Sequence, residues 1–157
     1  MKVTIAVLLF TISAGAQMTN AALLKLDREF AKATANEHLD GWMRYMMDYT
    51  VIFGTQGESQ IVGGKEEIRT YYRDLFSRPD FKMNWTPISA QLLPTGATGY
   101  TTGTFHWVMP NSRCNCVNDW RGTYLAVWEE EHPGGNLKLK ALFPSVDGKS
   151  VSCGCGS

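Results

Sequence analysis

The chain has 157 residues and carries 15 basic and 15 acidic side chains, so its formal net charge is zero. This length is enough for one domain with its own hydrophobic core, since domains commonly contain about 100–150 residues. The sequence has no basic cluster, and proteins that bind nucleic acids usually carry one. We therefore expect a single domain with no nucleic-acid partner.

The first residues are typical of a signal peptide. Met1 and Lys2 form a short basic start, Val3–Ile12 is apolar, and Ala14–Ala16 gives the small-x-small pattern of a cleavage site. The alternative is a buried N-terminal strand or helix. The apolar run is too short for a membrane span, which needs about 20 residues. We expect residues 1–16 to be removed, which leaves a secreted or periplasmic protein without a membrane partner.

Two helices separated by a short break are predicted at the start of the domain. Thr19 or Asn20 can cap the first helix. Apolar residues at spacings of three and four form its buried face: Leu23, Leu26, Phe30 and Ala33. The charged residues between them, including Asp27, are expected to form its solvated face. A break at Asn36–His38 precedes the second helix, which Asp40 can cap.

The stretch His38–Phe53 is predicted to run from that second helix directly into a strand. After Asp48 the apolar period changes to two, which is typical of a strand. One strand face then contains Tyr49, Val51 and Phe53, and the other contains Thr50 and Ile52. This junction places an aromatic-rich helix over the sheet, and we expect an apolar pocket between the two layers.

The rest of the chain is predicted to contain one more helix and mostly strands. A short strand at Gln60–Val62 is followed by a third helix between Gly64 and Pro79. Four long strands are then expected at Met83–Leu93, Thr98–Met109, Trp120–Glu130 and Leu137–Phe143. This order predicts an α+β fold with a curved antiparallel sheet of about six strands, covered on one face by three helices. We expect the domain to span residues 20–148, followed by a cysteine-containing tail at 149–157.

Four segments resemble the nuclear transport factor two-like superfamily, in particular its SnoaL-like and domain-of-unknown-function members. They read LLKLDREFAKATANEHLDGWMRYMMDYTVIF, IVGGKEEIRTYYRDLF, TGYTTGTF and RGTYLAVWEEE. The resemblance covers residues 21–147. It implies a cone-shaped sheet with a pocket inside the cone and, often, a dimer through the open sheet face. We therefore expect a homodimer.

The same superfamily includes ketosteroid isomerases, polyketide cyclases and epoxide hydrolases. The isomerase needs a carboxylate base and two oxyanion donors. Aligned with that pattern, this sequence has Phe30 in place of the tyrosine donor and Leu125 near the protonated acid. The base falls at Phe53 or Gly54. The sequence therefore argues against isomerase chemistry.

His106 and Arg121 are the candidates for a catalytic role. Arg121 can supply the arginine of an epoxide hydrolase, but Asp119 and Asp147 are expected in turn or capping roles. His106 shares its strand face with several hydroxyl side chains, and a structural or surface role is the alternative. Together with Tyr124 on the next strand, it would give an apolar pocket a polar spot, which is typical of a ligand site.

Aromatic residues with polar edges, together with His106, are the candidates for the pocket wall. They are Trp42, Tyr45, Tyr49, Tyr72, Trp85, His106, Tyr124 and Trp128. The alternative is that most of them are simply core residues, stabilising the fold by about 25 cal/mol per Å² buried. As a group they predict binding of a small hydrophobic or aromatic molecule, without a cofactor. A SnoaL-like isomerase, cyclase or hydrolase acting on a small hydrophobic substrate is the second hypothesis.

Two C-x-C pairs, Cys114 with Cys116 and Cys153 with Cys155, are expected to meet at one end of the sheet. Two disulfides suit an exported protein, and the connectivity stays open. A four-thiolate metal site is an alternative, although C-x-C is a poor spacing for zinc and fits Cu(I) better. A redox-active pair is a further alternative.

Overall fold

The structure is a computed structural model that describes residues 18–54, 61–111 and 116–153. It contains two helices, α1 (Asn20–Arg44) and α2 (Lys65–Phe76), among these residues. The six strands are β1 (Met46–Phe53), β2 (Ile61–Gly63), β3 (Lys82–Leu92), β4 (Thr98–Asn111), β5 (Cys116–Glu130) and β6 (Leu137–Cys153). They form one sheet in the order β2-β1-β6-β5-β4-β3. The predicted α+β class and the number of strands are confirmed.

The two expected N-terminal helices belong to one element, α1, so the prediction of three helices was wrong for the described residues. The expected break is a kink at His38, whose φ of 52° and ψ of −126° are not helical. The chain turns so sharply there that a Cβ on Gly41 would lie 2.1 Å from the carbonyl oxygen of Ala33. Asp40 consequently lies inside α1, where it forms an ion pair with Arg69 at 3.5 Å, whereas Thr19 accepts a hydrogen bond from the Ala22 amide as expected of a cap.

The sheet is mixed, which corrects the prediction of a purely antiparallel sheet. β1 follows α1 almost directly and pairs with β6 in parallel, while the other neighbours are antiparallel. β5 and β6 are also longer than expected, and they remain paired as far as Cys116 and Cys153. These two cysteines face each other and form a disulfide. Cys114 and Cys155 lie outside the described residues.

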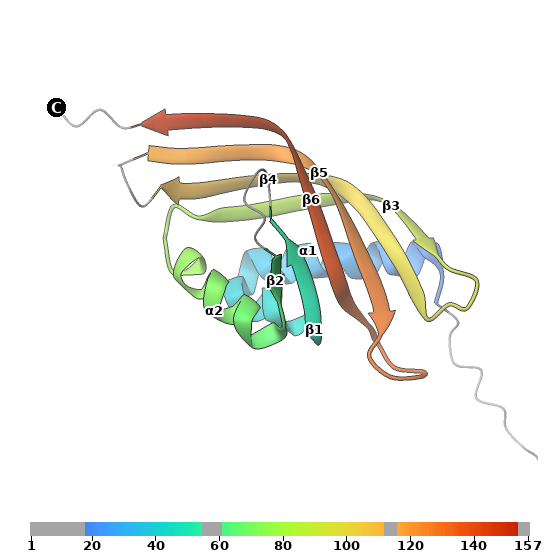
Figure 1. Ribbon diagram of the computed structural model, residues 1–157. Coiled ribbons are helices and arrows are strands. Elements are labelled where there is room, and N and C mark those ends of the chain that lie inside the picture. The colour runs from blue at the N-terminus through green and yellow to red at the C-terminus, as the bar shows by residue number, and fades with distance from the viewer. Residues whose placement is uncertain (1–17, 55–60, 112–115, 154–157) are drawn as a thin grey trace, which may run out of the picture.

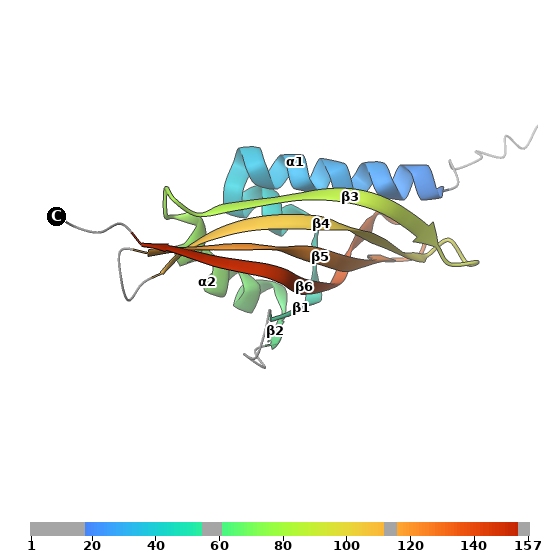
Figure 2. The ribbon, with the colours of Figure 1, turned by 90° about the horizontal axis from the view of Figure 1, so that it is seen from above.

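The sheet is strongly bent, and both helices lie on its concave side (Figure 1). Register irregularities between Arg121 and Gly122 and between Val127 and Trp128 interrupt the pairing of β5 with β6. Such bulges bend strands and increase their twist. α1 runs along β3 at one edge of the sheet (Figure 2). The concave side therefore encloses the hydrophobic core, which residues from both helices and the sheet form together.

No helix in the described part of the chain is long and apolar enough to cross a membrane.

Candidate functional site

Asp27 lies at the centre of the interior, on the face of α1 that is turned toward the sheet. Its side chain is completely buried. Its carboxylate accepts hydrogen bonds from Trp85 Nε1 at 2.9 Å and from the Tyr124 hydroxyl at 2.7 Å. The expectation that Asp27 belongs to the solvated face of the helix was wrong. The spacing contained the signal, because Asp27 is four residues after Leu23 and three before Phe30, and so shares their helical face.

The buried carboxyl belongs to a continuous polar network. Burial raises the pKa of Asp27, and hydrogen bonds from Thr101, Tyr124 and Trp85 partly oppose this shift. Trp128 Nε1 donates to the Thr101 hydroxyl oxygen at 2.9 Å, which leaves the Thr101 hydrogen free to donate to Asp27. Burial and the adjacent Asp27 carboxyl strongly raise the pKa of Tyr124. Tyr124 therefore stays protonated and serves as a hydrogen-bond donor.

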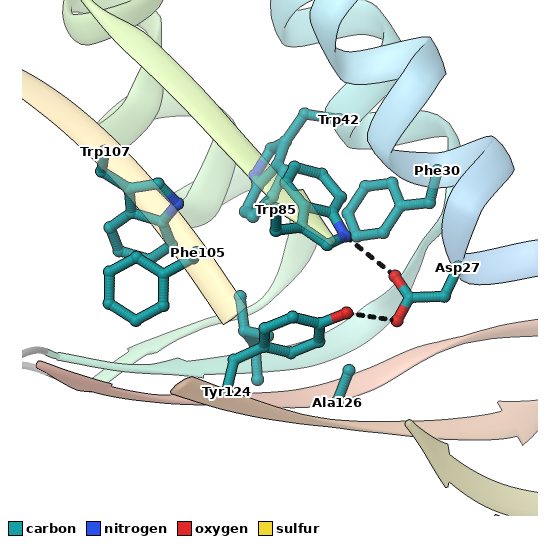
Figure 3. A pocket seen from close by; sticks show the side chains of 9 residues that line it. Asp27, Phe30, Trp42, Trp85, Phe105, Trp107, Tyr124 and Ala126 are labelled. Carbon is teal, nitrogen blue, oxygen red and sulfur yellow. Dashed lines mark hydrogen bonds between the residues drawn. The ribbon is translucent and has the colours of Figure 1, made fainter. Parts of the chain in front are cut away.

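A cavity of about 10 Å³ lies beside this network. Its walls are formed by Asp27, Phe30, Trp42, Trp85, Phe105, Trp107, Tyr124, Ala126 and Leu142 (Figure 3). This volume is about that needed for one water molecule. The expected hollow is nearly filled, because aromatic rings pack across it: the Phe30 ring lies 4.7 Å from that of Trp85 and 5.1 Å from that of Trp42.

Two residues of the cavity wall have indole N–H groups without a hydrogen-bond partner. They are Trp42 and Trp107, whose side chains are buried. An unpaired buried donor typically costs about 1–3 kcal/mol. The cavity therefore has an apolar surface, and the polar groups of its wall residues are either bonded to one another or buried behind that surface.

The predicted pocket residues fall into three groups. Trp42, Trp85 and Tyr124 line the cavity. Tyr45, Tyr72 and Trp128 pack behind it, against Phe30, Trp42 and Thr101 respectively. Tyr49 and His106 are not brought to it: Tyr49 is 54% exposed and donates a hydrogen bond to Glu129, and His106 points to the opposite face of the sheet.

The catalytic candidates lie together on the convex face, away from the cavity. Asp119 accepts from Arg121 Nε at 3.1 Å and lies 2.8 Å from His106 Nε2. The hydrogen bond from His106, and then that from Arg121, lowers the pKa of Asp119. Asp119 is inside β5 rather than at a strand end, which corrects its expected turn role. His106 pairs with Arg121 and Tyr124 with Gly103, so His106 and Tyr124 occupy opposite sheet faces and the expected polar spot does not form.

Several wall residues were not among the predicted site residues, notably Asp27, Phe105 and Trp107. Phe105 and Trp107 alternate with His106 along β4, and the sequence leaves open which of the two faces is buried. Their burial shows that the apolar face of β4 is the inner one.

The described residues contain no group of three or more His, Cys, Asp or Glu side chains arranged to hold a metal ion. The disulfide between Cys116 and Cys153 also removes two of the four thiolates that a cysteine metal site requires.

No family model and no curated protein matches the sequence. Solved structures do match the fold. A ketosteroid isomerase-like protein from Erwinia carotovora atroseptica is 13% identical, with a TM-score of 0.65 over 82% of this chain and 95% of its own. A protein from Catenulispora acidiphila in complex with S-DNPA is 10% identical, with a TM-score of 0.60 over 81% and 92%.

An NTF-2 like protein of unknown function from Shewanella oneidensis is 12% identical, with a TM-score of 0.58 over 78% of this chain and 95% of its own. At these identities the likeness concerns the fold. With its bent sheet, its helices on the concave side and its aromatic interior, the chain has the nuclear transport factor two-like fold.

Proposed function

We propose that this protein is an exported small-molecule-binding domain whose ligand occupies an enlarged form of the cavity beside Asp27. The observation that carries the proposal is an apolar cavity walled by aromatic side chains, beside the buried, hydrogen-bonded pair Asp27 and Tyr124. Concave apolar sites with a few polar groups are the usual form of small-molecule sites. The Catenulispora protein with the same fold was solved with a small molecule bound.

A ligand larger than water requires the cavity to open, and Trp85 is the side chain best placed to allow this. It is the only partly buried residue of the described cavity wall. It lies on β3, at an edge of the sheet. Outward rotation of its indole ring breaks one hydrogen bond to Asp27, worth about 1 kcal/mol. For comparison, a cavity of about 150 Å³ accommodates benzene.

Tryptophan fluorescence tests this proposal, because three of the wall residues are tryptophans. The disulfide-bonded protein is titrated with α-methylstyrene and with acetophenone, two compounds of nearly equal shape. We expect saturable quenching by at least one compound, and tighter binding by Trp85→Ala, in which the cavity is already enlarged.

The matched controls change alanine to leucine inside and outside the cavity. Ala126→Leu fills the cavity and should abolish the quenching, whereas Ala35→Leu on the exposed part of α1 should not. The proposal fails if neither compound binds the wild type or Trp85→Ala, or if Ala126→Leu binds as well as the wild type.

We also propose that two copies associate through the convex face of the sheet. A groove of about 330 Å³ crosses this face, and its lining includes Ile88, Leu125 and Phe143. Ile88 is 63% exposed and Phe143 39% exposed. Apolar surface of this kind is typical of protein interfaces.

Export is supported by the disulfide between Cys116 and Cys153, because such bonds persist in oxidising compartments. The mass of the protein recovered from periplasm or medium tests the proposal. We expect a mature chain that starts at Gln17. An N-terminus at Met1 on the exported protein would contradict cleavage, and retention in the cytoplasm would contradict export.

A further inference from the structure

We propose that Asn84, on the edge strand β3, is a site of N-linked glycosylation in the exported protein. Asn84, Trp85 and Thr86 form the acceptor pattern Asn-x-Thr, in which x is any residue except proline. No other asparagine in the sequence is followed two positions later by serine or threonine. The inference goes beyond ligand binding and rests on the proposed export, because these glycans are added to secreted chains.

The first observation is the orientation of the three residues along β3. Trp85 points into the interior, where its Nε1 donates to Asp27 at 2.9 Å. Successive side chains of a strand alternate between its two faces, so Asn84 and Thr86 lie together on the convex face. Both are exposed. The amide that receives the glycan and the hydroxyl that completes the pattern are therefore open on the same surface.

The second observation is the space beside Asn84. β3 is an edge strand of the sheet and has only β4 as a neighbour (Figure 2). In β4, Asn84 lies opposite His106, whose Nε2 is 2.8 Å from Asp119. Within residues 18–54, 61–111 and 116–153, no hydrogen bond holds the Asn84 side-chain amide. Attachment of a glycan to this amide therefore breaks no hydrogen bond between described residues.

The third observation concerns the free edge of the sheet. An exposed strand edge can pair with other chains, and proteins commonly protect such edges with lysine, proline or a covering group. β3 has 11 residues and contains Lys82 and Pro87, one on each side of the acceptor pattern. A bulky, hydrophilic glycan at Asn84 protects the same edge.

The glycan is compatible with the proposed dimer. The groove on the convex face is lined by Ile88 of β3 and not by Asn84. Four positions of an extended strand separate these two residues, which corresponds to about 13 Å. The glycan is therefore attached beside the groove and not inside it.

The co-reactant is an oligosaccharide linked through a diphosphate to a lipid. The Asn84 side-chain nitrogen forms a bond to C1 of the first sugar. The bond between C1 and the diphosphate oxygen breaks, so the lipid diphosphate leaves with that electron pair, and the nitrogen loses one proton. No oxidant or reductant takes part, and the folded domain is needed only to keep the product exposed.

The test is the mass of the protein that a eukaryotic cell line secretes when it expresses the full chain. The intact mass is measured before and after treatment with peptide-N-glycosidase F. We expect most secreted molecules to be heavier than the polypeptide and to return to the polypeptide mass after treatment, apart from conversion of the glycosylated asparagine to aspartate. Mass spectrometry of the proteolytic peptides should locate that aspartate at position 84.

Two variants remove different parts of the acceptor pattern. Asn84→Gln lacks the acceptor amide, and Thr86→Val replaces the hydroxyl by a methyl group of similar size, so both should be secreted without the glycan. Thr86→Ser keeps the hydroxyl and should keep the glycan. Thr104→Val is the matched control, because Thr104 is exposed and pairs with Thr86 but lies outside the pattern, and it should also keep the glycan.

The possible failures are distinguishable. Wild-type protein that is secreted without a glycan on Asn84, or a glycan that Thr86→Val retains in full, would overturn this inference and leave export and ligand binding standing. Retention of the wild type in the cytoplasm would overturn the proposed export, and this inference with it. The wild-type mass decides the question even if a variant fails to fold.

Discussion

Asp27 shows how one buried residue controls the chemistry of the interior. The cost of removing a carboxyl from water is offset by donors from three different strands, on Trp85, Thr101 and Tyr124. Removing the carboxyl would leave the indole and phenol donors unpaired, at about 1–3 kcal/mol each. Replacement by asparagine is milder, because its carbonyl can accept from Trp85 and its amide can donate to the Tyr124 oxygen.

The titration of the Asp27 carboxyl should be visible in the pH dependence of the free energy of unfolding. Burial raises the pKa of Asp27 above its ordinary value of 3.8, so at a pH between the two values the folded state holds a proton that the unfolded chain has released. The free energy of unfolding therefore falls as the pH rises through this window. Asp27→Asn does not titrate and should lack this fall, so it should gain stability relative to the wild type with increasing pH.

Urea unfolding of both proteins across the acidic to neutral range measures this difference. Asp119, whose pKa is lowered, contributes the opposite slope at lower pH, but it is present in both proteins and cancels in the difference. Asp80→Asn, at an exposed turn residue, is the control for loss of one carboxylate. A difference between Asp27→Asn and the wild type that does not vary with pH would contradict the prediction.

At the scale of elements, the kink in α1 determines where the aromatic side chains lie. The turn at His38 redirects the short end of α1 that follows it, so that the Trp42 ring packs 5.1 Å from the Phe30 ring. A positive φ is uncommon for residues other than glycine, and such strained positions typically cost about 1–3 kcal/mol. Gly41 allows the close approach to Ala33 that the turn requires.

His38→Gly should therefore stabilise the protein by about 1 kcal/mol, because glycine adopts positive φ without strain. The same change at Lys32, an exposed and regular position in α1, should destabilise it by about 1 kcal/mol. Urea midpoints of the two variants measure the contrast. Destabilisation by both substitutions would mean that the His38 side chain contributes more than its backbone strain costs.

At the scale of the whole molecule, the disulfide joins the ends of β5 and β6. The Cys116 and Cys153 residues are 37 positions apart. Closing a loop of this length is expected to stabilise the fold by about 3–4 kcal/mol in the chain-entropy model. A variant with all four cysteines changed to serine should lose about that amount relative to the oxidised wild type, measured by urea unfolding, because a bond between Cys114 and Cys155 alone would close almost the same loop.

Because Cys116 pairs with Cys153, the second of the two predicted disulfides would join Cys114 to Cys155. Mass spectrometry of proteolytic fragments without reduction should detect both bonds, and thiol titration should find no free cysteine. Two free thiols would contradict the second disulfide. Protein with four free thiols and a bound metal would instead support the thiolate site.

The convex face provides a second test at this scale. Ile88→Glu should convert a dimer into a monomer, because it places a charge in the apolar groove of each copy. Leu93→Glu is the matched control, since Leu93 is 45% exposed but lies in the turn after β3, outside the groove. Analytical ultracentrifugation measures both. A monomeric wild type at micromolar concentration would refute the dimer.

The sequence by itself determined the class of the fold, the approximate positions of the strands and the set of aromatic residues available to the interior. These features follow from local periodicity, which depends on neighbours three or four residues apart in a helix and two apart in a strand. The same periodicity places Asp27 on the apolar face of its helix, but a charged residue is ordinarily expected to be exposed to solvent. Only its partners on β3, β4 and β5 make that burial acceptable.

Tertiary structure alone decided which face of β4 is inner and where the helix turns at His38. It also decided that His106 meets Asp119 rather than Tyr124, and that Trp42 and Trp107 both line the cavity. Each of these depends on strand register and sheet bending, which are set by contacts between residues far apart in the chain. Local sequence patterns do not fix the strand register, because a shift of one position exchanges the two faces of a strand.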